Sequence, residues 1–224
     1  MTRTVAIDGP SGAGKSTVGY ALATRMDATF VDTGLMYRAL TLAAVERGID
    51  LEDGGVLGRL VRDSRIEVER ARSDQHDRLE TVRLDGHDVT VAVREPRIDR
   101  AVSAVSRHPE VRDAMLDVQR SAARRGGAVM VGRDIGTVVL PDATLKVYLT
   151  ASAEIRALRR AVEMELPERY EAYLDEIRRR DAADSGRTLA PLRQADDALV
   201  LDTGVLNVDE CVDAIIERLE AVGA

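Results

Sequence analysis

One segment, GPSGAGKS at residues 9–16, constrains the fold of this chain more than any other. It fits the pattern G-x-x-x-x-G-K-[ST], whose glycines let the backbone curl until successive N–H groups point inward at phosphate oxygens. The apolar run RTVAID (3–8) predicts a buried strand before it, and KSTVGYALATRM (15–26) has the apolar spacing of a helix. A strand, this motif and a helix are the context in which the motif binds phosphate, so we predict a phosphate-binding loop here.

The motif also assigns chemistry to its side chains. We expect Lys15 to reach the β- and γ-phosphates of ATP and the Ser16 hydroxyl to ligate Mg²⁺, while the helix N-terminus adds partial positive charge. Lysine is rare elsewhere, because Lys146 is the only other one and arginine is used instead. The residues expected to bind ATP are Gly9, Pro10, Ser11, Gly12, Ala13, Gly14, Lys15, Ser16 and Thr17.

Strands and helices alternate along most of the chain. LMYRALTLAAVERG (35–48) has helical spacing, and a last helix is expected to begin with Asn207 as its N-cap. Such alternation points to a parallel sheet with crossover helices. Besides residues 3–8, the expected strands lie in the apolar runs at 28–34, 127–132, 143–150 and 197–203. We therefore predict an α/β protein of the P-loop NTPase fold, with a five-stranded parallel sheet flanked by helices.

The pattern changes between residues 63 and 98. RIEVER, RLETVRL and HDVTVAV resemble short alternating strands, and LDGHD resembles a turn between two of them. A helical stretch is expected at 98–107, and Pro109 begins a longer helix that ends at Gly126. We predict a small antiparallel β insertion at 63–98 within a core made of residues 1–62 and 99–224. A helical lid at 152–170 belongs to that core.

Composition narrows the class of protein. A formal net charge of −7 and an aromatic content of 3% argue against a binding surface for nucleic-acid polymers. No apolar run approaches the ~20 residues that span a bilayer, and the N-terminus lacks the apolar stretch of a secretory signal. The single Cys211 forms neither an intrachain disulfide nor a thiolate metal site. We expect a cytoplasmic protein without membrane contact, and a monomer, because no extra apolar helix face stands out.

Three classes of protein use such a loop. A GTPase would need N-K-x-D to read its base, but the only asparagine is Asn207, in LNVDE, and no D-x-x-G segment occurs. A motor or transport ATPase would usually need a larger assembly surface, which nothing in the sequence indicates. A kinase of a small molecule or nucleotide needs a second anion site that faces the first, and a lid that excludes water.

Charged residues follow two of the predicted strands. In an open parallel sheet, ligands bind at the carboxyl ends of the strands. Arg38, in DTGLMYR, is therefore expected at the mouth of the loop, where it can grip a second phosphate. Arg133 and Asp134 are adjacent opposite charges at the end of a buried strand, which a ligand site or a structural ion pair would explain. DTGLMYR also supplies Asp32, Thr33 and Tyr37.

Two later helices carry further charges. The first supplies Arg156, Arg159 and Arg160, which can close over a transferring phosphate or lie on a solvated face. The second has an apolar stripe at Tyr170, Tyr173, Leu174 and Ile177 and is expected to end at Gly186. Continuing that spacing leads to Arg180, Asp184 and Arg187. Charges on an inward stripe need partners, so these three either pair internally or hold a sugar hydroxyl and a phosphate.

At this level of detail the chain resembles the bacterial cytidylate kinases of the CMP/dCMP kinase family, nearly end to end. The segments that carry the resemblance are IDGPSGAGKST, DTGLMYRAL, LDGHDVTVAVREPRID, SAVSRHPEVR, GRDIGTVVLPDA and RRRDAADSGRTLAPL. Many families share the loop, whereas the insertion followed by GRDIGTVV is far more specific. The resemblance implies a transferase of pyrimidine nucleotide metabolism that phosphorylates CMP or dCMP with ATP, giving ADP and CDP or dCDP.

The resemblance also implies a role for each matching position. Lys15 and the loop amides would hold the ATP phosphates, and the arginines at 156–160 would belong to the lid. The implied catalytic residues are Lys15, Arg133, Arg156 and Arg160. The implied CMP phosphate ligands are Arg38, Arg133 and Arg187, with cytosine read by Ser103, Arg112 and Asp134 and the ribose or adjacent phosphate held by Arg180 and Asp184. Thr33 and Tyr37 complete the expected CMP-binding set, and Asp32 is expected to order the Mg²⁺ shell through water.

The chemistry of the base agrees with these roles. Cytosine offers an N4 amino donor beside O2 and N3 acceptors, so the Asp134 carboxylate suits the amino group and Arg112 and Ser103 suit the acceptors. Uracil has a carbonyl at C4, which an ionised Asp134 would face unfavourably. Two alternatives remain: a P-loop kinase of another small acceptor such as UMP, and a nucleotide-binding regulatory module without turnover.

Overall fold

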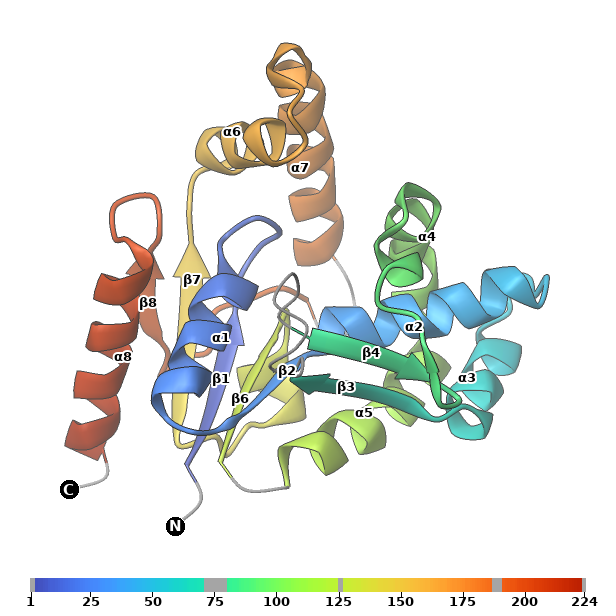
Figure 1. Ribbon diagram of the computed structural model, residues 1–224, viewed down its shortest axis with the longest axis horizontal. Coiled ribbons are helices and arrows are strands. Elements are labelled where there is room, and N and C mark those ends of the chain that lie inside the picture. The colour runs from blue at the N-terminus through green and yellow to red at the C-terminus, as the bar shows by residue number, and fades with distance from the viewer. Residues whose placement is uncertain (1–2, 71–79, 125–126, 187–190, 223–224) are drawn as a thin grey trace. The chain divides into compact units, whose positions relative to one another are not determined.

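The structure is a computed structural model that describes residues 3–70, 80–124, 127–186 and 191–222 (Figure 1). The chain divides into two compact units. One unit comprises Met1–Ala28 with Gly127–Ala224, and the other comprises Thr29–Gly126. The predicted insertion at 63–98 lies within the second unit, and its boundaries at 62/63 and 98/99 stay a prediction.

A parallel sheet forms the centre of the first unit. Its central strand β1 (Thr4–Asp8) pairs in parallel with β6 (Ala128–Gly132) on one side and β7 (Leu145–Thr150) on the other. Strand β8 (Leu199–Asp202) continues the sheet beyond β7. Together with β2 (Thr29–Asp32), the order is β2-β6-β1-β7-β8, so the predicted five-stranded sheet and α/β class are confirmed.

Helices cover this sheet because its strands are apolar on both faces. Val5, Ala6 and Ile7 of β1 are fully buried, as expected for a central parallel strand. Helix α1 (Lys15–Arg25) packs on β6 and on α8 (Val208–Val222). Asn207 caps α8 as predicted: its Oδ1 accepts from Glu210 N at 3.0 Å, and Asn207 N donates to Glu210 Oε2 at 2.8 Å. Cys211 is buried in α8, and this burial raises the pKa of its thiol.

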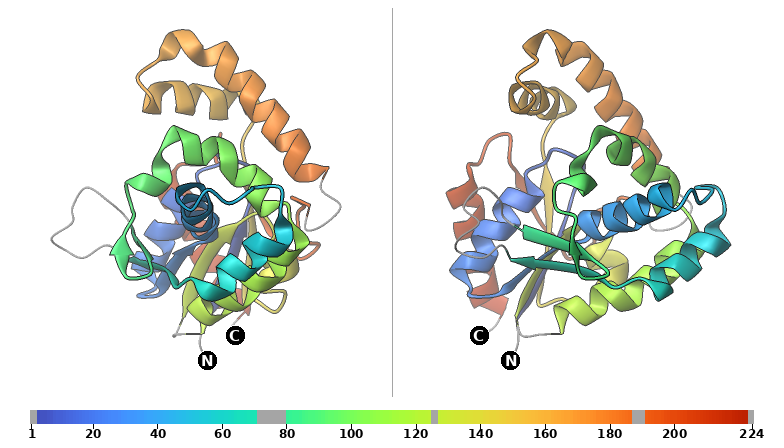
Figure 2. Two further views of the ribbon diagram at one scale, coloured as in Figure 1. Left: turned by 90° about the vertical axis from the view of Figure 1, so that its right-hand side faces the viewer. Right: turned by 45° about the vertical axis from the view of Figure 1, so that its right-hand side comes forward.

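A pair of helices follows β7. Helix α6 (Ala153–Glu163) packs against α7 (Tyr170–Ser185), with the short turn η3 (Pro167–Arg169) between them, and both views of Figure 2 show the two side by side in orange. The predicted stripe forms their contact, because Tyr173, Leu174 and Ile177 are buried there with Ala157 and Ala161. Gly186 is the C-cap of α7, as its sequence predicted.

The second unit is built around α2 (Thr33–Glu46) and a three-stranded antiparallel sheet. That sheet has the order β3 (Ile66–Arg70), β4 (Glu80–Leu84) and β5 (His87–Asp88), which confirms the antiparallel insertion. The other elements are α3 (Gly54–Asp63), the 3₁₀ turn η1 (Ala92–Arg94), α4 (Pro96–Ser106) and α5 (Pro109–Ala123).

The last predicted strand of the insertion is wrong for most of its length. HDVTVAV was expected to be extended throughout, but only His87–Asp88 pairs, and the chain then turns into η1. The Asp88 carboxylate accepts from Thr90 N at 3.0 Å and from the Thr90 hydroxyl at 2.6 Å. This local turn competes with strand pairing. The buried Thr90 hydroxyl accepts from Val82 N of β4, where a backbone carbonyl oxygen of a longer strand was expected.

The described residues include no helix that is long and apolar enough to cross a bilayer.

Candidate active site

The phosphate-binding loop connects β1 to α1 as its sequence predicted. Gly9 has φ 152°, and a Cβ on it would lie 2.1 Å from the Leu149 carbonyl oxygen, so the chain can leave β1 this way only with glycine there. Gly14 is the left-handed N-cap of α1, with φ 79°. The loop therefore presents the amino end of α1, where free N–H groups and partial positive charge favour an anion.

Lys15 folds back over this loop. Its side chain is largely buried, and Nζ donates to the Pro10 carbonyl oxygen at 2.7 Å. Ser16 and Thr17 follow it in the first turn of α1. The Ser16 hydroxyl is a hard oxygen donor of the kind that Mg²⁺ accepts, and Mg²⁺ in such sites takes its other ligands from substrate phosphates and water. The described residues contain no cluster of three or more histidine, cysteine, aspartate or glutamate side chains that could hold a metal ion.

The segment after β6 is fastened to the end of β1. Asp8 is only 4% exposed, and its carboxylate accepts from Ile135 N at 2.7 Å and Gly136 N at 2.8 Å. Burial raises the pKa of Asp8 to about 6, although these two hydrogen bonds oppose the rise. Asp134, which precedes Ile135, is itself buried.

Arg133 connects three elements. Its Nε donates to Asp184 Oδ2 at 2.8 Å, and its Nη1 donates to the Gly9 carbonyl oxygen at 3.2 Å. The ends of β6 and α7 and the start of the loop are thus joined through one guanidinium. Asp184 is 2% exposed, so the predicted inward stripe of α7 does end in a buried charge. The structure pairs it internally with Arg133, a partner 51 residues away.

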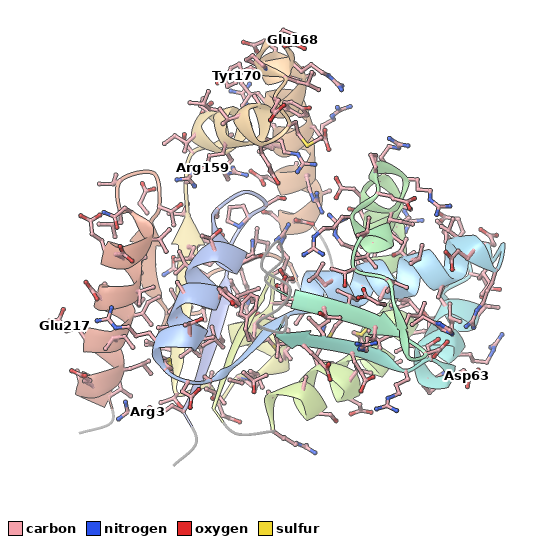
Figure 3. The ribbon with its side chains drawn as sticks, in the orientation of Figure 1. Arg3, Asp63, Arg159, Glu168, Tyr170 and Glu217 are labelled. Carbon is pink, nitrogen blue, oxygen red and sulfur yellow. The ribbon has the colours of Figure 1, made fainter. Side chains whose placement is uncertain are left out.

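The arginines of α6 differ from one another. Arg156 is buried and donates to the carbonyl oxygens of Ser11 and Ala151 as well as to Asp181. Arg159 lies on the side of α6 that faces the loop, as Figure 3 shows, and donates to Thr203 Oγ1 at 3.0 Å and to the Gly12 carbonyl oxygen at 3.4 Å. Arg160 is half-buried and pairs with Glu163 at 3.3 Å.

Within the second unit, two arginines expected to bind CMP already have partners. Arg38 donates to the Val93 carbonyl oxygen at 3.2 Å and forms an ion pair with Asp99, and both charged side chains are mostly buried. Arg112 lies 5.9 Å from the centre of the Tyr37 ring and donates to the Ser106 carbonyl oxygen at 3.3 Å.

The remaining expected residues are divided between the two units, with Asp32, Thr33 and Ser103 in the second and Arg180 in the first. Asp32 is the N-cap of α2, where its carboxylate accepts from Gly34 N at 2.9 Å, and Thr33 is buried in the first turn. Ser103 is half-buried on α4, and Arg180 is half-buried on α7. Arg187 lies outside the described residues.

Sequence reasoning missed three acidic partners: Asp8, Asp99 and Asp181. A signal existed for Asp181, because it lies four residues after Ile177 and so continues the apolar stripe as directly as Arg180 does. For Asp8 the signal was its place as the last residue of a buried strand, where an acidic side chain needs a partner. Nothing in the sequence marked Asp99.

Comparison with known proteins decides the family. The sequence model of the family described as cytidylate kinase matches residues 5–221. The chain belongs to the cytidylate kinase family. The resemblance drawn from the motifs is therefore confirmed over nearly the whole chain, including both halves that flank the insertion.

Individual members of the cytidylate kinase family agree. A cytidylate kinase from Exiguobacterium sibiricum is 48% identical over 219 residues, which cover 96% of each protein. Another from Exiguobacterium sp. strain AT1b is 46% identical over 224 residues, covering 98% of this chain and 97% of the relative. An uncharacterized protein from Eubacterium ventriosum has a solved structure with a TM-score of 0.54 at 12% identity, covering 98% of this chain and 99% of that one, and so it shares the fold alone.

Proposed function

We propose that this cytidylate kinase family member transfers the γ-phosphoryl group of ATP to CMP or dCMP, giving ADP and CDP or dCDP in pyrimidine nucleotide metabolism. The observation that carries the proposal is the family match across residues 5–221, which includes the phosphate-binding loop and the Arg133–Asp134 segment fastened to it. A non-catalytic nucleotide-binding module would not need this second set of charges beside the loop.

On the ATP side, the loop residues Gly9 to Thr17 bind the phosphates through backbone N–H groups. The Lys15 ammonium gives up its hydrogen bond to the Pro10 carbonyl oxygen and binds phosphate oxygens instead. This needs only a small movement, since Pro10 belongs to the same loop. Arg156 and Arg160 neutralise charge from the lid side as it develops on the transferring group. Mg²⁺ would be held by Ser16 and the substrate phosphates, with Asp32 ordering its water shell, and it would supply charge neutralisation for the transferring phosphoryl group.

On the CMP side, three arginines bind the phosphate: Arg38, Arg133 and Arg187. Ser103, Arg112 and Asp134 read the base, with the Asp134 carboxylate accepting from the cytosine N4 amino group. Arg180 and Asp184 hold the ribose or adjacent phosphate, and Thr33 and Tyr37 line the same site. The Arg133–Asp184 pair is compatible with this role, because Nη2 of that guanidinium takes part in neither described bond.

The chemistry needs no general base. The second pKa of a phosphate monoester is near 6, so the attacking oxygen of CMP is already largely ionised at neutral pH. Catalysis then rests on aligning that oxygen with the γ-phosphorus and on neutralising the charge of the transferring group. Closure of the insertion and lid, at residues 63–98 and 152–170, excludes water and so suppresses hydrolysis of ATP. We further propose that the enzyme works as a cytoplasmic monomer.

A coupled assay of ADP release, run with CMP, dCMP, UMP, AMP and GMP, tests the proposal. CMP and dCMP are expected to stimulate turnover well above the ATP-only rate, and the other three to stimulate it weakly. A preference for UMP would instead support a P-loop kinase that phosphorylates another small acceptor. Absence of stimulation by any acceptor, with ATP still bound, would leave a regulatory module as the better description.

A further inference from the structure

Asp8 has an unusual position for a carboxylate. It is the last residue of β1, directly before Gly9, and it is 4% exposed in a strand whose other inner residues are apolar. Its two oxygens accept from two consecutive backbone N–H groups, Ile135 at 2.7 Å and Gly136 at 2.8 Å. These are the first two residues after Arg133 and Asp134, which the proposed function assigns to CMP.

A carboxylate is the side chain that fits this arrangement. When ionised it is an acceptor at both oxygens, whereas an asparagine amide offers one acceptor and one donor. With asparagine, one of the two N–H groups would face an NH₂ group and lose its partner. Burying the charge is costly, so these two hydrogen bonds account for keeping a carboxylate at a position where an apolar residue would otherwise be favoured.

The charged groups around Asp8 oppose one another. Asp134 raises the pKa of Asp8 and Lys15 lowers it, while burial has the largest effect. Two side chains of β7 also lie in this region. Burial raises the pKa of the Tyr148 hydroxyl, and the charge of Asp8 adds to that rise. The methylene groups of Lys146 lie beside Gly136, and its ammonium pairs with Asp197 at 2.9 Å. No described cation forms an ion pair with Asp8, so the backbone N–H groups are its direct partners.

The segment held by Asp8 is also closed on its other side. Val138 N and Val139 N both donate to the Asp134 carbonyl oxygen, at 2.9 and 3.2 Å, within the single π-helical turn η2 (Ile135–Val139). Arg133 reaches back in the opposite direction to the Gly9 carbonyl oxygen. Two side chains therefore connect the ends of the adjacent strands β1 and β6. Asp8 binds the backbone that follows β6, and Arg133 binds the backbone that follows β1.

We infer that Asp8 is a positioning residue: its carboxylate holds Arg133 and Asp134 in register with the phosphate-binding loop, so that CMP is presented to ATP in the correct alignment. Asp8 itself touches neither nucleotide. The inference rests on the proposed function, because it assumes that Arg133 and Asp134 contact CMP. A displacement of about 1 Å at a reacting centre can cost on the order of 100-fold in rate, which makes such positioning measurable.

The experiment compares Asp8→Asn and Asp8→Glu with the wild type, measuring kcat and the KM values for CMP and ATP separately. We expect Asp8→Asn to lower kcat/KM for CMP by about 10- to 100-fold, with a much smaller change in KM for ATP. Asp8→Glu keeps two acceptor oxygens and should recover part of the loss. Ile7→Val, at the neighbouring buried position of β1, is the control for a modest loss of packing and should leave the KM for CMP unchanged.

The pH dependence of kcat/KM for CMP is a second measurement, and a purely structural role of Asp8 would leave it unchanged. Protonation of Asp8 removes an acceptor from one N–H group, so kcat/KM for CMP in the wild type should fall on the acid side of pH 6 more steeply than ionisation of CMP alone requires. Asp8→Asn should show only the part due to CMP. Identical profiles for the two proteins would overturn the inference, as would equal losses toward CMP and ATP.

Failure of the inference is distinguishable from failure of the proposed function. Arg133→Ala and Asp134→Ala test the CMP site directly. If both weaken CMP and Asp8→Asn does not, Asp8 is not a positioning residue although the site stands. If neither weakens CMP, the assumption beneath the inference is wrong and the inference falls with it.

Discussion

Arg156 and Asp181 face each other through two parallel hydrogen bonds, Nη1 to Oδ1 at 3.0 Å and Nη2 to Oδ2 at 2.6 Å. The Arg156 side chain is only 5% exposed and the Asp181 side chain 27% exposed. Because the same guanidinium donates to the Ser11 carbonyl oxygen at 3.1 Å, one side chain of α6 connects α7 to the phosphate-binding loop. A bidentate pair of this kind fixes orientation as well as charge.

Removing the carboxylate should therefore be costly. Asp181→Ala leaves a buried guanidinium without its counter-ion, and we expect the free energy of unfolding to fall by about 3–5 kcal/mol. Urea denaturation measures this loss. Asp175→Ala, at an exposed carboxylate on the same helix, should change stability by no more than about 0.5 kcal/mol. A loss below about 1 kcal/mol for Asp181→Ala would mean that the pair behaves as a surface ion pair.

The two lysines offer a matched comparison. Lys15→Ala removes the cation that we propose binds the ATP phosphates, and we expect kcat to fall by roughly 100- to 1,000-fold. Lys146→Ala removes a lysine that pairs with the exposed Asp197, and such pairs contribute about 0–1 kcal/mol to stability. Its kcat should stay within about threefold of the wild type. Comparable losses in the two variants would argue against a direct role for Lys15.

Glu80 should make the stability of the protein depend on pH. Burial, with Asp32 adding to it, raises the pKa of Glu80 from 4.5 to about 7, against the pull of Arg94. The folded state then binds more protons than the unfolded state between these values, so the free energy of unfolding falls as pH rises from about 4.5 to about 7. At full effect this amounts to about 3 kcal/mol.

Glu80→Gln removes this contribution, and unfolding measured at pH 5 and pH 8 should differ less in the variant than in the wild type. Glu69→Gln, at an exposed position of the adjacent strand β3, should keep the wild-type difference. A Glu80→Gln protein that follows the wild type at both pH values would show that Glu80 titrates normally.

Asp134 should determine the choice of base. We expect Asp134→Ala to reduce the ratio of kcat/KM for CMP to that for UMP by about 10- to 100-fold, because the carboxylate proposed to accept from the cytosine N4 amino group has no such partner on uracil. KM for ATP should change much less. An equal loss toward both bases would assign Asp134 a structural role in place of base recognition.

The elements with strong local signals could be predicted from sequence. The glycine loop, the apolar parallel strands and the Asn207 cap each depend on neighbouring residues, so the pattern is complete within a short window. Helix α3 (Gly54–Asp63) was not predicted, since it begins with two glycines, although Asp53 caps it by accepting from Val56 N at 2.9 Å. The prediction of a strand over 87–93 was wrong because the Asp88 side chain forms a local turn with Thr90, and the chain leaves the sheet there despite its alternating pattern.

Partners in the site were harder to predict than residues. The stripe of α7 indicated that Asp184 faces inward, which is confirmed, but it left the choice between an internal pair and a ligand open. Arg133 and Arg156 find their carboxylates 51 and 25 residues away, a distance over which no periodicity carries information. Asp8 and the backbone of η2 are joined in the same way, through the register between β1 and β6.

The buried thiol of Cys211 makes the protein suited to optical measurement. It is the only cysteine in the sequence, and a buried thiol with a raised pKa reacts slowly with maleimides. Dyes would therefore label introduced cysteines selectively, for example at the exposed positions Asp63→Cys in one unit and Glu217→Cys in the other. Energy transfer between the two dyes would then report, molecule by molecule, whether a nucleotide changes the distance between the labelled positions, without prior removal of a native cysteine.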